Sequence, residues 1–145
     1  MPSIEFSTGE PDEVAGALLG LLAANLAVLA NGYEPDPAVL KRLQYIEDPP
    51  GLDIWFTIQK LLDRGSGDCE DLALGWGAYL IALGVPCSIW IAILKPYKRR
   101  YHAYLRVRGK LFDPSVVGGM RALPLDYYKP ENGRSIWVPG IHFKD

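Results

Sequence analysis

The stretch Asp68–Leu83, DCEDLALGWGAYLIAL, decides how the fold of this chain is interpreted. Asp68 is a residue type that favours the N-cap of a helix, and Asp71 stands three residues later, where a capping-box acid is found. The rest of the stretch is apolar on nearly all sides, and Gly84 and Pro86 follow it as signals that end a helix. The sequence therefore predicts a central, buried helix over this stretch.

Strands are expected after this helix. Residues 87–94, CSIWIAIL, are β-branched and aromatic, which is typical of a buried strand. Residues 101–108, YHAYLRVR, alternate, so that His102 and Tyr104 share one face. Further short strands are expected at 111–113 and 135–138. Because helices precede an antiparallel meander, we expect an α+β fold, in which N-terminal helices and the cysteine-bearing central helix pack on a small antiparallel sheet.

The N-terminal part of the chain is expected to be helical. Pro11 and the acids after it suit a helix start, and Asn31-Gly32 suits a C-terminal cap, so a long apolar helix is predicted over 11–32. Two shorter helices are predicted, at 38–46 and at 53–63 with Asp53 as N-cap.

The long apolar helix could also be interpreted as a membrane span. Residues 14–33 carry no charge, and a run of this length can cross a bilayer. However, the run is rich in Ala and Gly, contains Asn25 and follows acidic residues, and it has no features of a signal peptide. We therefore expect a buried helix and no membrane partner, with self-association through this helix as an alternative use of its apolar face.

Composition favours one soluble globular domain over 1–145. Hydrophobic residues make up 49% of the 145 residues and charged residues 22%, with a net charge of -2, so a nucleic-acid partner is not expected. A short basic cluster at 95–100 is interpreted as a hairpin tip. The two cysteines, Cys69 and Cys87, cannot form a disulfide scaffold, and no metal-ligand spacing is present. We expect a reducing compartment such as the cytoplasm, no cofactor and no metal.

Cys69 is the candidate nucleophile. It stands in the first turn of the central helix, where unpaired backbone N–H groups and the helix dipole stabilise a thiolate and lower the pKa of the thiol. The same N–H groups can bind the oxyanion of a tetrahedral intermediate. Asp68, Glu70 and Asp71 flank the thiol with opposing negative charge, so an imidazole from elsewhere in the chain is needed, and His102 is the candidate.

Asp113 can complete the site, depending on the hairpin that follows the His102 strand. If Arg108 and Gly109 form a two-residue loop, Tyr104 lies opposite Asp113, and His102 is the diagonal neighbour of Asp113 on the same face. A loop of Gly109 and Lys110 keeps the face but moves Asp113 further away. In the first case Asp113 can orient His102, and His102 can take the proton of Cys69, as in a catalytic triad.

These segments resemble motifs of transglutaminase-like cysteine enzymes, in the order Cys, His, Asp. The matching segments are GDCED at 67–71, YHAYLRV at 101–107 and FDPS at 112–115. The resemblance covers about 53–115 and is closest to compact bacterial and phage transglutaminase-like cysteine proteinases. It implies a papain-like core, with Cys69 as nucleophile, His102 as general base and Asp113 as its orienter.

The resemblance also implies a reaction and leaves alternatives open. A peptide or protein substrate would be hydrolysed at an amide through a thioester on Cys69, or an amine would resolve the thioester in a transamidating transglutaminase. The chain could instead be a structural or assembly protein without turnover, virion-associated if phage-encoded. A metal site from Cys69, His102, Asp113 and His142 has no supporting ligand spacing. Gln59 and Trp55 precede Cys69, as oxyanion donors do in related enzymes, but neither stands in a recognisable motif.

Overall fold

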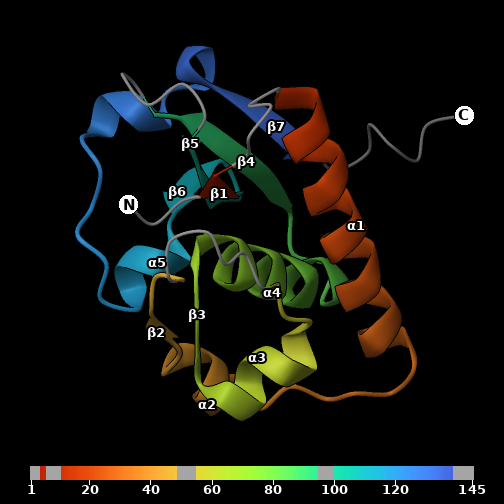
Figure 1. Cartoon of the computed structure of the whole chain (residues 1–145). Coiled ribbons are helices and arrows are strands. Elements are labelled where there is room, and N and C mark those ends of the chain that lie inside the picture. The colour runs from red at the N-terminus through yellow and green to blue at the C-terminus, as the bar shows by residue number, and fades with distance from the viewer. Residues whose placement is uncertain (1–3, 6–10, 49–54, 95–99, 139–145) are drawn as a thin grey trace, which may run out of the picture.

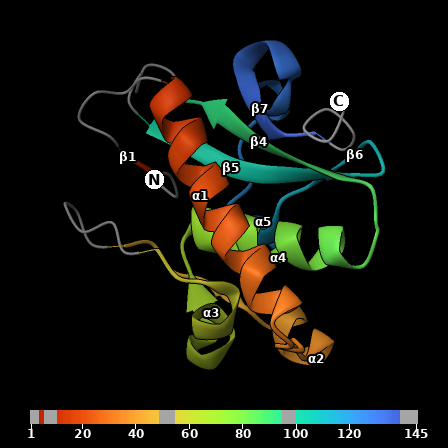
Figure 2. The ribbon, with the colours of Figure 1, turned by 90° about the vertical axis from the view of Figure 1, so that its right-hand side faces the viewer.

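The fold is a mixed α+β arrangement in which helices pack against a small antiparallel sheet (Figure 1). The computed structural model describes residues 4–5, 11–48, 55–94 and 100–138. Helix α4 (Cys69–Ala82) lies against the sheet, and α1 (Pro11–Ala30) runs beside both α4 and the sheet (Figures 1 and 2). The expected α+β class and the central position of the cysteine-bearing helix are confirmed.

Helix α4 forms as its sequence predicts. The Asp68–Asp71 capping box is present, and the N–H of Asp68 donates to Asp71 Oδ2 at 3.2 Å. Gly84, at φ 78°, follows the helix in the left-handed conformation that glycine adopts readily. A Cβ at Gly75 would lie 2.7 Å from Leu61 Cδ2, so glycine allows α3 (Ile58–Arg64) to approach α4 closely.

The sheet has the strand order β1-β5-β4-β7, with β6 also paired to β5, and every pair in it is antiparallel. Its strands are β1 (Ile4–Glu5), β4 (Cys87–Ile93), β5 (Arg100–Val107), β6 (Lys110–Phe112) and β7 (Gly133–Trp137). The expected meander is therefore confirmed as β4-β5-β6, and the strand expected at 135–138 begins two residues earlier, at Gly133.

One edge of β5 is shared by two short strands. Ile4 pairs with Tyr101, and Phe112 pairs with Leu105, while β4 pairs with the other edge from Tyr101 to Val107. Between β1 and β6, residues 102–104 therefore have no described strand beside them on this edge. His102 lies in this gap.

The β5–β6 hairpin decides between the two predicted loops. Arg108 (φ 52°) and Gly109 (φ 79°) both have positive φ, as a two-residue type I′ turn requires, and Val107 pairs with Lys110. Continuing this register places Asp113 opposite Tyr104. The loop that brings Asp113 near His102 is thus the one observed.

Two predictions for the segments before α4 are wrong. The helix expected at 38–46 is only α2 (Pro37–Lys41), and it is followed by β2 (Gln44–Tyr45), which pairs in parallel with β3 (Ser66–Gly67). Backbone hydrogen bonds from Gln44 and Ile46 to Gly65 and Gly67 draw this segment into a strand. Pairing with a distant segment outweighs the local helical pattern.

Helix α3 begins at Ile58 rather than at Asp53, which lies outside the described residues. Thr57 is extended, at ψ 161°. The N–H groups of Phe56 and Ile58 donate to Asp71 Oδ1 and Asn25 Oδ1, each at 2.8 Å. Because these tertiary hydrogen bonds use N–H groups at the helix start, they hold the segment before Ile58 outside the helix.

Helix α1 begins at the expected Pro11, ends at Ala30, two residues before the expected end, and is buried on one face only. Its larger side chains enter the core that α4 and the sheet share, while an opposite stripe of small residues is exposed: Gly16, Gly20, Ala23, Ala24, Ala27 and Ala30. The window Glu13–Ala30 has the length and hydropathy of a membrane span, and 33% of it is buried. Packing of α1 on the domain is confirmed, and the expected burial applies to one face of the helix. The hairpin tip expected at the basic cluster falls on residues 95–99, which lie outside the described residues.

Replacing Asn25 by Ala should destabilise the fold. Asn25 is fully buried, and its Oδ1 is the acceptor for the N–H of Ile58 at the start of α3. Its loss leaves a buried N–H without this acceptor, so we expect the free energy of unfolding to fall by about 1–3 kcal/mol in urea titrations. The exposed Asn31→Ala is the control and should change it by less than about 0.5 kcal/mol. Equal stability of Asn25→Ala and wild type would contradict this role.

Candidate active site

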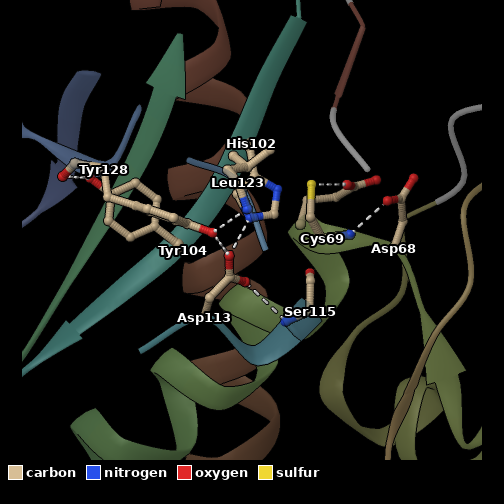
Figure 3. Close-up of polar contacts among 9 residues, drawn as sticks. Asp68, Cys69, His102, Tyr104, Asp113, Ser115, Leu123 and Tyr128 are labelled. Atoms are coloured by element: carbon tan, nitrogen blue, oxygen red, sulfur yellow. Dashed lines mark hydrogen bonds and ion pairs between the residues drawn. The ribbon is translucent and has the colours of Figure 1, made fainter. Parts of the chain in front are cut away.

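The structure brings His102 and Asp113 into direct contact. His102 Nε2 lies 2.6 Å from Asp113 Oδ2, and both residues are buried (Figure 3). Asp113 is also the N-cap of α5 (Pro114–Val117), because its Oδ1 accepts from the N–H of Ser115 at 3.1 Å. The two carboxylate oxygens thus have separate tasks: one contacts the imidazole, and the other fixes the start of a helix.

Tyr128 holds the same carboxylate from another element. Its hydroxyl donates to Asp113 Oδ2 at 2.6 Å, and its ring packs edge-on against Tyr104, with centroids 5.0 Å apart. Tyr128 comes from a short 3-10 helix, η1 (Leu125–Tyr128). Tyr128 is not among the residues predicted for the site, because it stands in a tyrosine-rich tail and no periodic pattern links it to Asp113.

The surroundings of Asp113 favour its charged form. Burial alone would raise the pKa of this carboxyl, but the hydrogen bond and charge of His102, with the hydrogen bonds from Tyr128 and Ser115, lower it overall. A charged Asp113 fixes a proton on Nε2 of the imidazole. The second ring nitrogen, Nδ1, is then the one available as an acceptor.

Cys69 lies on the other side of the imidazole. In Figure 3 the His102 ring and the Cys69 sulfur point toward one another, with the second ring nitrogen on the side of the sulfur. The backbone N–H of Ala103, which lies in the gap between β1 and β6, also hydrogen-bonds the sulfur. The three predicted site residues therefore gather at one place, where the N-terminus of α4 meets the gap in β5.

The thiol of Cys69 is held in its protonated form. Burial, then the charges of Glu70 and Asp68, raise its pKa well above the usual value, against the lowering effect of the Ala103 N–H. The side chain is 0% exposed, and Sγ donates to Glu70 Oε2 at 3.4 Å. The expectation of a lowered thiol pKa is thus wrong, because full burial beside carboxylates outweighs the helix dipole.

The acids around Cys69 are buried as well. Asp68 accepts from the N–H of Cys69 at 2.7 Å and from the N–H of Asp48 at 3.3 Å, and Asp71 is the capping acid that the sequence predicted. Burial is the largest cause that raises the pKa of Asp68 to about 6 and of Asp71 to about 7, and it raises the pKa of Glu70 well above its usual value. The first turn of α4 therefore retains protons at mildly acidic pH.

Two overlapping groups of these side chains are close enough to hold a cation. The ligand atoms of Asp68, Cys69 and Glu70, and those of Asp48, Glu70 and Asp71, lie within 4.8 Å of one another. Carboxylate oxygens suit hard cations such as Ca²⁺ or Mg²⁺. This is a different set from the one considered in the sequence, since His142 lies outside the described residues and His102 and Asp113 bind each other.

The remaining candidates from the sequence differ in their surroundings. Gln59 is exposed on α3, whereas Trp55 packs, partly buried, against the core cluster that includes Cys69. Cys87 is buried in β4, and burial raises its pKa to about 12. It is therefore interpreted as an inert core thiol.

Stability should fall as the pH rises from about 4 to about 7. Unfolded Asp loses its proton near pH 4, whereas folded Asp68 and Asp71 keep theirs up to about 6 and about 7, so the stability that these protons contribute is lost across that range. Each proton contributes up to about 1.4 kcal/mol per pH unit to the slope. Asp113, with its lowered pKa, contributes stability that is lost only below about pH 4.

Urea unfolding between pH 3.5 and 8, with a chelator present, measures this dependence. Glu70→Gln should flatten the decline, because Gln cannot release a proton, while Glu131→Gln at an exposed position is the control. Stability that rises steadily from pH 4 to pH 7 would contradict the protonated state of the first turn of α4.

Comparison of the chain with protein-family models, curated proteins and solved structures finds no match. The interpretation of the site therefore depends on its own geometry.

Proposed function

We propose that the protein is a cysteine-dependent acyl-transfer enzyme that hydrolyses a peptide or isopeptide amide. Cys69 is the nucleophile, His102 the general base and Asp113 its orienter. The observation that carries the proposal is the buried 2.6 Å contact between His102 Nε2 and Asp113 Oδ2, on an imidazole whose other nitrogen faces a helix N-terminal thiol (Figure 3). This is the arrangement of nucleophile, base and orienter that covalent catalysis requires.

The resting thiol determines how the first step runs. Because the pKa of Cys69 is raised, the proton moves from Sγ to His102 Nδ1 while the sulfur attacks the carbonyl carbon. The C–S bond forms and the carbonyl electron pair moves onto oxygen. Asp113 stabilises the imidazolium that results, and Tyr128 keeps the carboxylate in place.

Two further steps complete the reaction. The tetrahedral intermediate collapses, the C–N bond breaks, and His102 gives its proton to the leaving amine, which leaves a thioester on Cys69. Water then loses a proton to His102 and attacks the thioester, releasing a carboxylic acid and restoring the thiol. With an amine in place of water, the same steps would be a transamidation.

The proposal includes a transglutaminase-like, papain-like core within one domain. It is supported by the packing of the cysteine-bearing α4 against β5, the strand that carries the histidine. The motifs on these two elements and at 112–115 are those that resemble the family. A peptide or protein is the proposed substrate, in a reducing compartment such as the cytoplasm.

A second candidate, a non-catalytic assembly protein with the same fold, is favoured by one observation. The Cys69 side chain has no exposed surface. An enzyme must open this site to a substrate, whereas an assembly protein need not.

Acylation by p-nitrophenyl acetate separates the two candidates. Wild type should release p-nitrophenol in a burst, with the acetyl group located on Cys69 by mass spectrometry, and Cys69→Ala should abolish the burst. His102→Ala should slow acylation about 10²–10⁴-fold, because the general base is lost. Cys87→Ala is the control and should behave like wild type. If Cys69 is acylated no faster than Cys87, the assembly candidate takes the place of the enzyme.

A further inference from the structure

The hydroxyl of Tyr45 is a buried hydrogen-bond donor that has no use in the mechanism above. Its oxygen is buried and has no hydrogen-bond partner among the described residues. Buried polar atoms nearly always have a partner, so an exception calls for an explanation. The phenol ring itself is ordinary core, because it packs against the cluster around Leu61 and Leu72.

The backbone of Tyr45 is fixed by the strand before α4 and by the residue that ends α5. Tyr45 pairs with Gly67, which directly precedes the N-cap of α4, and its N–H donates to the carbonyl of Gly118 at the end of α5 at 2.9 Å. A Cβ at Gly118 would lie 2.7 Å from Tyr45 N, so glycine is needed for this approach. The position of Tyr45 is thus linked to the start of α4, which carries Cys69, and to the end of α5, which follows Asp113.

The hydroxyl also lies within electrostatic reach of the nucleophile. Burial raises the pKa of Tyr45 most, and the negative charges that Asp68, Cys69, Glu47 and Glu70 carry when ionised would raise it further. A phenol with a raised pKa keeps its proton through the neutral range. Tyr45 is therefore a permanent hydrogen-bond donor, on a strand that pairs with the residue before the N-cap of α4.

The backbone N–H that the sequence offered for the oxyanion is already occupied in the resting structure. The N–H of Cys69, which is suitably placed on a helix N-terminus, already donates to Asp68 Oδ1 at 2.7 Å, and Gln59 is exposed. The acids of this turn repel a developing negative charge wherever they are ionised, so a donor directed at the carbonyl oxygen is all the more necessary.

We propose that the Tyr45 hydroxyl donates a hydrogen bond to the oxyanion of the tetrahedral intermediate formed on Cys69. This assignment rests on the proposed acyl-transfer function. It gives the unpartnered hydroxyl its partner during the reaction, when the carbonyl oxygen acquires its charge. No proton is transferred from Tyr45; its hydrogen bond strengthens as the C–S bond forms.

Two reagents that modify the same sulfur test the assignment. Acylation by p-nitrophenyl acetate passes through an oxyanion, whereas alkylation by iodoacetamide displaces iodide from a tetrahedral carbon and forms none. Tyr45→Phe should slow acylation of Cys69 about 10²-fold and leave alkylation unchanged. Its melting temperature should equal or exceed that of wild type, because the hydroxyl has no partner in the fold. Tyr79→Phe is the matched control, since Tyr79 packs against the same cluster and lies at the far end of α4.

The possible results differ in what they overturn. If Tyr45→Phe acylates as fast as wild type, or slows both reactions equally, Tyr45 is not the oxyanion donor, and the triad stands. If wild type itself is not acylated at Cys69, the proposed function fails and the assignment fails with it.

Discussion

The burial of the first turn of α4 is the constraint on which the rest of the structure depends. A helix N-terminus leaves N–H groups without partners, and here Asp68 and Asp71 provide acceptors from within the turn itself. Asp71 also binds the N–H of Phe56 and so fixes the segment that leads into α3, while Asp68 binds the N–H of Asp48. The Asp68–Asp71 cap thus binds the backbone of the segments at Asp48 and Phe56, and Cys69 lies in the interior. Acids that hold the turn together also oppose ionisation of the thiol, so base catalysis by His102 becomes the means of activating it.

Asp113 links the site to the rest of the fold in a similar way. One side chain contacts the imidazole, accepts from Tyr128 and caps α5. Helix α5 in turn leads to Gly118, whose carbonyl holds Tyr45. The geometry at the imidazole therefore depends on both faces of the sheet, since Tyr128 and Tyr104 pack on the face opposite the α4 core. Because these contacts share the Asp113 carboxylate, a change in one of them should alter the geometry of the others.

The sequence predicts those features that arise from local patterns. The caps of α4 and the strands β4 and β5 follow from residue types at fixed spacings. A tight turn after β5 is predicted as well, but the structure is needed to choose the Arg108-Gly109 loop, whose register brings Asp113 toward His102. The failures have a common cause. Contacts between segments distant in sequence cause each of them. Such contacts delay the start of α3 to Ile58, form the β2 strand, bring Tyr128 to Asp113 and raise the pKa of Cys69. Burial of a thiol beside its own flanking acids is a property of the packed fold, and in an exposed helix the dipole would act on the same thiol without this opposing effect of burial.

The gap in the edge of β5 has a consequence for self-assembly. An unpaired sheet edge invites another chain to add a strand, which leads to aggregation. Among the described residues, the section of this edge between Tyr101 and Leu105 that has no strand beside it is bounded by β1 at one end and by β6 at the other, so an incoming strand finds too few consecutive backbone groups to pair with. The gap between β1 and β6 leaves the Ala103 N–H available to the Cys69 sulfur. The same gap is too short for a strand of a neighbouring molecule to pair with.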